Sequence, residues 1–300
     1  MATKIVWMDG ELINWDDATV HVTSLGLHYG LGFFEGIRCH STPAGPAIFR
    51  LTDHLRRLRR SAAIYGVKLP YPIEDLAVAC RSVVAANHLS DCYLRPLVFM
   101  GEGGNPFATA FRTAIIASES GPLAGSPAGA GARAQISSFQ RFGANSMPPT
   151  AKACGQYLNS YLAQAEALRA GCDEAILLNA KGLVADGWAH NVFVVVDEAV
   201  VTPPVSAGAL PGITRQTIMT LAAEDGLAVR EQDLARSDLY LADECFLTGT
   251  SVGVVPVLSV DGRPIGVGEP GPVTARLIER LSDVMHGMVD AHKDWRESVA

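Results

Sequence analysis

The chain has 300 residues, with 24 Lys and Arg against 31 Asp and Glu, and a formal net charge of −7. This acidic balance argues against a protein that binds nucleic acid, because such binding depends largely on neutralising phosphates. The composition, 48% hydrophobic and 18% charged, excludes a disordered chain. The length is close to the size at which one hydrophobic core divides into two.

The sequence shows no sign of a membrane span or of export. Its apolar runs are shorter than the ~20 residues that a spanning helix needs. Asp9 comes too early for a signal peptide. Six cysteines stand singly, without the spacing of a disulfide framework or a zinc site, at positions 39, 80, 92, 154, 172 and 245. We therefore expect reduced cysteines, no metal and a cytoplasmic location.

Apolar spacing and turn residues predict the secondary structure. In chain order they predict strands at 4–8 and 11–15, helices at 51–65 and 72–87, strands at 92–100 and 112–118, a strand at 133–139, and helices at 153–170, 214–225 and 273–291. Asp9-Gly10 favours a tight hairpin turn. Thr52 is the expected N-cap of the first helix, and Pro72 can occupy the first turn of the second.

Residues 121–131 read GPLAGSPAGAG, with no charge and one large side chain. Such a segment buries too little to order itself strongly, so it is the best candidate for an interdomain linker. We predict a small N-terminal domain over 1–120 and a larger domain over 132–300. Strands and helices do not alternate strictly, which indicates an α+β fold.

Lys152 differs from the other four lysines, because its neighbours in PPTAKACG are small or apolar and no acid is near in sequence. A lysine in an apolar pocket loses proton affinity, and a neutral amine can attack a carbonyl to form a Schiff base. The simpler alternative is a surface lysine that leads into a helix. Position alone favours that alternative.

Three further segments contain polar groups suited to an anionic or ring-containing ligand. Asp186 can pair with a protonated ring nitrogen, although an aspartate in a turn more often caps its own backbone. Ile213 and Thr214 open a helix, where free N–H groups bind phosphate, and an ordinary N-cap is an equal alternative. Thr250 lies in TGTS, a weaker candidate for a second anion site.

The N-terminal third supplies a possible substrate pocket. Tyr29, Phe34 and Tyr93 can line an apolar surface, and Arg95 can form a cationic end for a carboxylate. The aromatic residues can equally belong to an ordinary core. Arg95 lies in an otherwise apolar strand, so burial requires a partner for it.

Eight motifs occur in a fixed order between about residues 7 and 274. They are HYGLGFFEGIR (28–38), DHLRRLRRSA (53–62), YLRP (93–96), AKACGQYLNSYLAQAEA (151–167), GLVADGWAHNVF (182–193), LPGITR (210–215), ADECFLTGTS (242–251) and VDGRPIG (260–266). This ordered set resembles the branched-chain amino acid aminotransferases, which are fold-type IV enzymes dependent on pyridoxal 5′-phosphate (PLP). The resemblance implies a small α/β domain, a larger domain with a pseudo-barrel of strands, a flexible linker and a homodimer or higher homo-oligomer.

The resemblance also implies roles for individual residues. Lys152 matches the lysine that holds PLP covalently and moves the substrate proton. Besides Lys152, the residues that match the cofactor site are Arg57, Ile213, Thr214 and Thr250 at the phosphate, Tyr157 at the phenolic oxygen and Asp186 at the ring nitrogen. Residues matching the substrate site are Tyr29, Phe34, Tyr93, Arg95, Thr250 and Ser251, with Trp188 expected to affect pocket volume.

The activity implied by the resemblance is transfer of an amino group from a branched-chain or similar apolar L-amino acid to 2-oxoglutarate. PLP supplies the electron sink, and the protein supplies orientation and charge. One aromatic pocket edged by one arginine can accept both an apolar side chain and a carboxylate.

The sequence departs from the family near the expected ring-nitrogen acid. Asp186 stands where the family has Glu. Trp188 and Ala189 replace small residues, and His190 and Gly253 stand where an acid is usual. The simpler explanation is drift within an ordinary aminotransferase. The alternative is a homologue specialised for another amino acid or for another PLP reaction, such as a lyase, D-amino acid or amine transamination. A relative that binds PLP without turnover is a further alternative.

Overall fold

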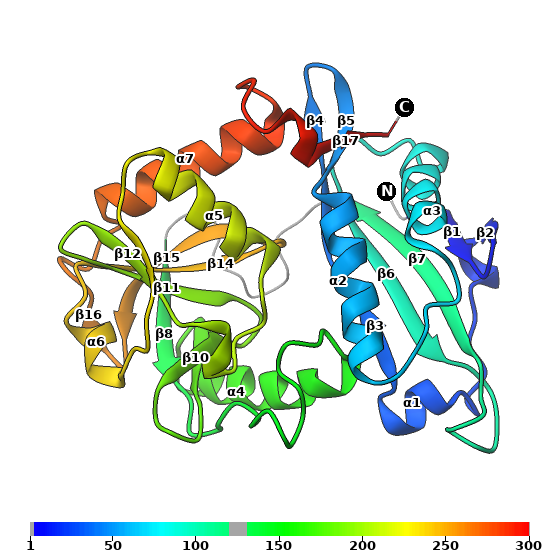
Figure 1. The fold of residues 1–300 in the computed structure, drawn as a ribbon, viewed down its shortest axis with the longest axis horizontal. Coiled ribbons are helices and arrows are strands. Elements are labelled where there is room, and N and C mark those ends of the chain that lie inside the picture. Colours follow the sequence, from blue (N-terminus) through cyan, green and yellow to red (C-terminus); the bar gives the residue numbers. More distant parts are fainter. Residues whose placement is uncertain (1–2, 120–130, 300) are drawn as a thin grey trace. The chain divides into compact units, whose positions relative to one another are not determined.

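The computed structural model describes residues 3–119 and 131–299, which form two compact units (Figure 1). One unit comprises the described residues within Met1–Gly121, Ala151–Gly155 and Asp283–Ala300. The other comprises those within Pro122–Thr150 and Gln156–Ser282. Apart from Gly131, the predicted linker lies outside the described residues. No helix of the described ranges combines the length and apolarity needed to cross a membrane.

The first unit is built on an eight-stranded sheet in the order β17-β5-β4-β6-β7-β1-β2, with β3 also paired to β6. Its strands are β1 (Ile5–Met8), β2 (Glu11–Asn14), β3 (Gly32–Phe34), β4 (Ile37–Thr42), β5 (Gly45–Phe49), β6 (Cys92–Met100), β7 (Phe111–Glu119) and β17 (Arg296–Ser298). Alternating or continuous apolar residues predict the hairpin β1–β2 and the long pair β6–β7. Those four predicted strands are confirmed to within a residue.

Two 14-residue helices, α2 (Leu51–Ile64) and α3 (Ile73–Ala86), pack on this sheet, and a short helix α1 (Leu25–Tyr29) precedes β3. Their apolar faces join the strands in one core cluster. The prediction of Thr52 as N-cap is wrong. Arg50 occupies that position in a left-handed conformation (φ 53°), and Thr52 lies inside the first turn, where its N–H donates to Glu297.

The second unit contains a nine-stranded sheet in the order β10-β9-β8-β15-β14-β11-β12-β13, with β16 on β15. The strands are β8 (Ala132–Ile136), β9 (Glu174–Leu178), β10 (Val184–Gly187), β11 (Asn191–Val196), β12 (Ala199–Thr202), β13 (Val229–Glu231), β14 (Glu244–Gly249), β15 (Gly253–Val260) and β16 (Arg263–Pro264). Valine and isoleucine dominate its inner positions, as expected for strands buried in a core. This mixed sheet and its helices agree with the predicted α+β class.

The helices of this unit are α4 (Tyr157–Arg169), α5 (Ile213–Glu224) and α6 (Arg236–Tyr240), together with residues 272–282 of α7 (Pro272–His286). The expected helices at 153–170 and 273–291 are thus shorter than predicted. A 3-10 turn at Cys154–Gln156 precedes α4, and α7 ends at a left-handed glycine, Gly287.

Candidate active site

The predicted site residues fall into two groups, one in each unit. The first unit carries Tyr29, Phe34, Arg57, Tyr93, Arg95 and Lys152. The second carries Tyr157, Asp186, Trp188, Ile213, Thr214, Thr250 and Ser251. Each group is described within its own unit.

Lys152 is fixed through its backbone at the edge of the first unit. Its N–H donates to the Ser61 hydroxyl on α2 (2.9 Å), and its carbonyl accepts the N–H of Phe34 on β3 (3.2 Å). The next residue, Ala153, forms an isolated bridge with Phe33. The backbone of the lysine is therefore held between a helix and a strand, while the residue as a whole is partly exposed.

The Phe34 ring collects two cations. The Lys152 Nζ lies 4.7 Å from the ring centroid and the Arg95 guanidinium carbon lies 4.6 Å from it. Arg95 also donates to the Tyr93 hydroxyl (3.2 Å), since residues two positions apart in β6 lie on the same face of the strand. Gly36 permits this arrangement, because a Cβ there would overlap the Tyr93 hydroxyl.

Tyr29, at the end of α1, is 63% exposed, so the structure places its side chain at the surface of the unit.

Arg57 is held rigidly by a buried acid. Its guanidinium donates two hydrogen bonds to the Glu35 carboxylate (2.6 and 2.8 Å), and His54 Nδ1–H donates a third (2.7 Å). Burial alone would raise the pKa of Glu35, but the Arg57 charge and the His54 contact outweigh it and hold that pKa well below its usual range. The predicted phosphate-binding arginine is thus oriented by an ionised carboxylate.

Asp186 lies on β10 at a β-bulge. Val184 pairs with Leu178 and Asp186 with Leu177, so Ala185 is an extra residue in the ladder. The carboxylate accepts hydrogen bonds from Asn191 Nδ2 and from the Leu210 N–H, each at 3.0 Å. It is 3% exposed, so it does not merely cap an exposed turn.

Burial raises the pKa of Asp186 to about 6. The nearby Arg141 charge, the Leu210 N–H and the two side chains of His190 and Asn191 act in the opposite direction. A buried carboxylate gains most from an additional positive partner, which a protonated ring nitrogen would be.

The start of α5 is joined to this acid. Leu210 donates to Asp186 and its carbonyl accepts a bond from Asn191 (2.8 Å), two residues before the N-cap Gly212. Gly212 offers no side-chain cap, and a Cβ there would overlap the Asn191 amide oxygen. The first N–H groups of α5, at Ile213 and Thr214, therefore receive no acceptor from the N-cap.

The turn between β14 and β15 contains Thr250 and Ser251, both partly exposed. Thr248, just before the turn, pairs with Asn191 across β14 and β11, so the turn belongs to the same part of the second unit as Asp186. Tyr157 is the first residue of α4 and is partly exposed.

The unusual residues after Asp186 have structural partners in the second unit. The Trp188 ring packs against a small cluster formed by α4 and β9, and it meets the His190 ring edge-on (5.9 Å between centroids). His190 Nδ1 lies 3.2 Å from the Glu174 carboxylate, with both side chains 1% exposed. That Trp188 also affects the substrate pocket stays a prediction.

Sequence patterns missed the residues that hold the predicted ones, Glu35 and Asn191, and two further buried polar residues, His54 beside Glu35 and Arg141, whose charge acts on Asp186. Each is polar and at most 9% exposed. The signal available was a polar residue inside an apolar motif, as in FFEGIR and HNVF, which requires a buried partner.

Within the described residues, Arg141 Nε and Thr248 Oγ1 are buried without a hydrogen-bond partner. Three features suit a ligand with an anionic end and a basic ring: these unpaired buried polar atoms, the raised pKa of Asp186, and the helix start without a side-chain cap. These features fit PLP, which has a phosphate and a pyridine nitrogen.

Comparison with known proteins agrees with this fit. The Amino-transferase class IV family matches residues 32–260. A branched-chain-amino-acid aminotransferase of Pseudomonas aeruginosa is 44% identical, covering 98% of this chain and 97% of its own. The crystal structure of the Escherichia coli branched-chain amino acid aminotransferase superposes with a TM-score of 0.96 at 41% identity, over 99% of this chain and 100% of that one.

A second solved structure, the T.th. branched-chain amino acid aminotransferase complexed with N-(5′-phosphopyridoxyl)-L-glutamate, has a TM-score of 0.94 at 39% identity and full coverage of both chains. The family match extends over most of the chain, and the relatives cover nearly all of it. The chain therefore belongs to the class IV aminotransferases, which are PLP-dependent enzymes of fold type IV.

Proposed function

We propose that this enzyme transfers the amino group of a branched-chain L-amino acid to 2-oxoglutarate, giving the 2-oxo acid and glutamate. The observation that carries this proposal is the Phe34 ring, which Lys152 and Arg95 share. It combines an apolar surface for a hydrocarbon side chain, an amine, and a cation for a distal carboxylate. The names of the relatives support the same substrate pair.

We assign the cofactor contacts as follows. Lys152 holds the cofactor carbonyl. The phosphate is bound by Arg57, by the α5 amides at Ile213 and Thr214, and by Thr250. Asp186 faces the ring nitrogen, and Tyr157 donates to the phenolic oxygen. Glu35 keeps Arg57 in place, and Asn191 keeps Asp186 in register with α5.

When bound, PLP supplies an electron sink for the bond that breaks at the substrate Cα. Lys152, whose Nζ lies beside the Phe34 ring, would take the proton from that carbon. Asp186, as a carboxylate, keeps a positive charge on the cofactor ring. Tyr93 and the Thr250 and Ser251 amides bind the α-carboxylate, and Arg95 binds the distal carboxylate of glutamate.

Lys152 is tested by Lys152→Ala, with the exposed Lys68→Ala as control. We expect loss of the visible absorbance of lysine-bound cofactor and loss of turnover in the first variant only. Equal turnover in Lys152→Ala and the control would contradict the assignment.

Substrate choice is tested with L-Leu, L-Ile, L-Val, L-Phe and D-amino acids as donors to 2-oxoglutarate. We expect the three branched-chain L-donors to give the highest kcat/KM. A preference for another donor, or a product other than the 2-oxo acid, would support the specialised homologue suggested by Asp186, Trp188 and His190.

Arg95 is tested by Arg95→Leu, with the exposed Arg60→Leu as control. Because a hydrogen bond to a charged group contributes about 1.5–3 kcal/mol, kcat/KM for 2-oxoglutarate should fall about 10- to 150-fold. An acceptor with a branched hydrocarbon side chain should be affected much less. Equal losses for both acceptors would refute a carboxylate-binding role.

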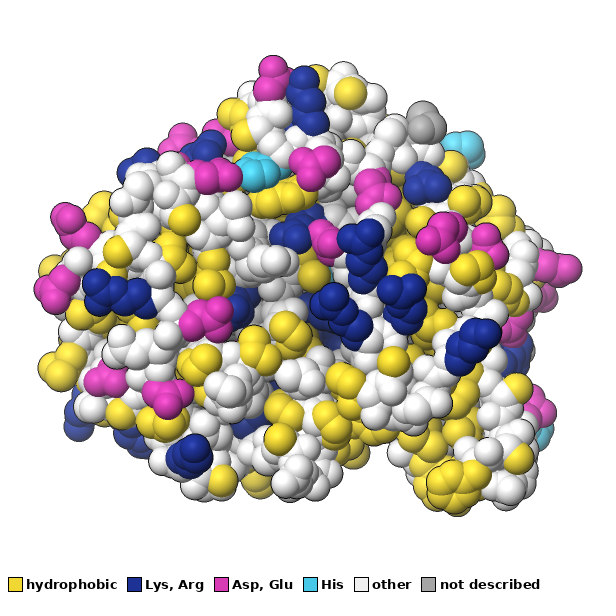
Figure 2. Space-filling view, viewed as in Figure 1, with side chains coloured by type: hydrophobic (Ala, Val, Ile, Leu, Met, Phe, Trp, Pro, Cys, Tyr) yellow, Lys and Arg dark blue, Asp and Glu magenta, His cyan; other side chains and the backbone are white. Residues whose placement is uncertain are grey.

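We further propose a homodimer in the cytoplasm. Large apolar side chains on α1 are exposed, with Leu27 at 66% and Tyr29 at 63%, and Figure 2 shows hydrophobic side chains gathered over this helix. A second copy of the chain is the occupant that the family suggests. Light scattering tests the dimer by comparing the molecular mass of the wild type with that of Leu27→Asp, which should dissociate into single chains.

All six cysteines are free thiols, which supports a reducing compartment. Cell fractionation tests this location.

A further inference from the structure

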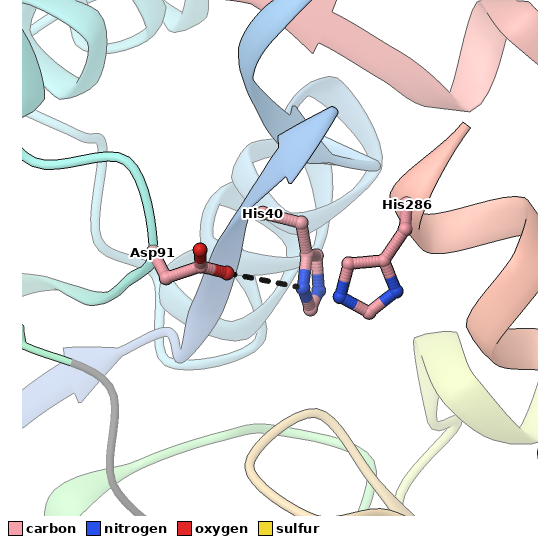
Figure 3. A group of neighbouring side chains, drawn as sticks. All are labelled: His40, Asp91 and His286. Atoms are coloured by element: carbon pink, nitrogen blue, oxygen red, sulfur yellow. Dashed lines mark ion pairs between the residues drawn. The ribbon is translucent and has the colours of Figure 1, made fainter. Parts of the chain in front are cut away.

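Two histidines and an aspartate converge in the first unit, and none of the three is among the residues assigned to the active site. His40 lies on β4, Asp91 directly precedes β6, and His286 is the last residue of α7 (Figure 3). One ligand atom from each lies within 4.8 Å of the others. Figure 3 shows the two imidazole rings close together, with Asp91 directed at the His40 ring.

His40 is the unusual member of the group. It is 3% exposed, and neither of its ring nitrogens has a hydrogen-bond partner among the described residues. Its Nδ1 lies 4.0 Å from the Asp91 carboxylate, which is too far for a hydrogen bond. A buried imidazole without a hydrogen-bond partner loses its bonds to water, and the edge-on contact with the His286 ring does not replace them. A ligand that accepts a nitrogen lone pair would remove this deficit.

The donor set fits a divalent zinc ion. Zinc binds imidazole nitrogen at about 2.0–2.1 Å and carboxylate oxygen at similar distances, so its tetrahedral ligand atoms lie about 3.3 Å apart. The present group needs to contract by about 1.5 Å at most, by this comparison. The Asp91 side chain is 44% exposed and His286 is partly exposed, so both side chains have room to move.

We propose that His40, Asp91 and His286 bind one zinc ion, with water at the fourth position on the exposed side of Asp91. The ion would join β4, the start of β6 and the end of α7, and so act on stability. The N–H of Ser41 donates to Asp91 (3.3 Å) and helps to orient the carboxylate. Arg38, on the same strand, also places a positive charge near His40, which should weaken cation binding.

The test titrates zinc chloride into cofactor-loaded, chelator-treated enzyme by calorimetry, and counts bound zinc by elemental analysis. The wild type should bind one zinc per chain and show a higher midpoint temperature of unfolding with zinc. Asp91→Asn and His286→Gln each remove one ligand at a partly exposed position and should weaken binding at least about 100-fold, since even outer-shell changes cost 10- to 100-fold.

His40→Gln completes the set, and the exposed His21→Gln is the matched control that should bind like the wild type. If His40→Gln does not fold, the other two variants still decide. Absence of zinc binding in the wild type would overturn the proposal. Equal binding by the wild type, Asp91→Asn and His286→Gln would also overturn it, because the ion would then lie elsewhere.

Discussion

The buried Asp186 carboxyl should make the stability of the cofactor-free enzyme depend on pH. Its pKa is raised from 3.8 to about 6 in the folded chain. A raised folded-state pKa stabilises the fold at low pH, and this contribution is lost as the pH rises through 6. The full contribution of Asp186 to the free energy of unfolding is about 3 kcal/mol, and about 1.4 kcal/mol of it is regained when the pH falls from 8 to 5.

Asp186→Asn isolates this contribution. The amide is uncharged and nearly isosteric, and it retains one oxygen for the two donors, Asn191 and Leu210. The lost hydrogen bond costs about 1–3 kcal/mol at every pH. The titration instead changes with pH, so the free energy of unfolding of the wild type should rise relative to Asp186→Asn by about 1.4 kcal/mol from pH 8 to pH 5.

The assay is urea unfolding of both cofactor-free proteins at four pH values between 5 and 8. Asp233→Asn removes an exposed carboxyl from the same unit and is the matched control. A difference between wild type and Asp186→Asn that stays constant, or that falls as the pH is lowered, would refute the reasoning.

Two further changes test how the cofactor residues are held. Glu35→Gln removes the negative charge that faces the buried Arg57 cation. It should cost about 3–5 kcal/mol in unfolding free energy and weaken PLP binding, measured by urea unfolding and cofactor titration; unchanged values in both would contradict the positioning role. Gly212→Ala should force Asn191 from its place and lower stability by about 1–3 kcal/mol with weaker PLP binding, whereas Gly104→Ala, where a Cβ meets nothing, should have little effect in the same thermal melts. A Gly212→Ala enzyme that behaved like Gly104→Ala would exclude the predicted overlap.

Local patterns predicted the elements whose cause is local. The strand at 92–100 has the predicted bounds because nine residues without a charge other than Arg95 can only be a buried strand or helix, and β-branched and aromatic neighbours favour the strand. The N-cap of α2 was missed because Arg50 adopts a left-handed conformation that is tied down by distant residues, including the Trp295 carbonyl. Sequence spacing holds no information on such a contact.

The candidate site follows the same division. Lys152 and the α5 start were predicted from their flanks only in combination with the order of motifs. The bonds that orient Arg57 and Asp186 include those from Glu35 and Leu210, which lie 22 and 24 positions away. A pairing across such distances depends on the fold, and a single sequence does not reveal it.

The extra residue in β10 makes the length of this strand as important as its composition. If the ladder ran regularly from Val184, Asp186 would stand opposite Ile176, whose side chain belongs to the apolar cluster that also contains Val184. The bulge shifts the phase, so the acid stands opposite Leu177 instead. An alignment of relatives by hydrophobic alternation alone would therefore place this acid one position out of step, and an insertion or deletion here should be tolerated less well than most substitutions.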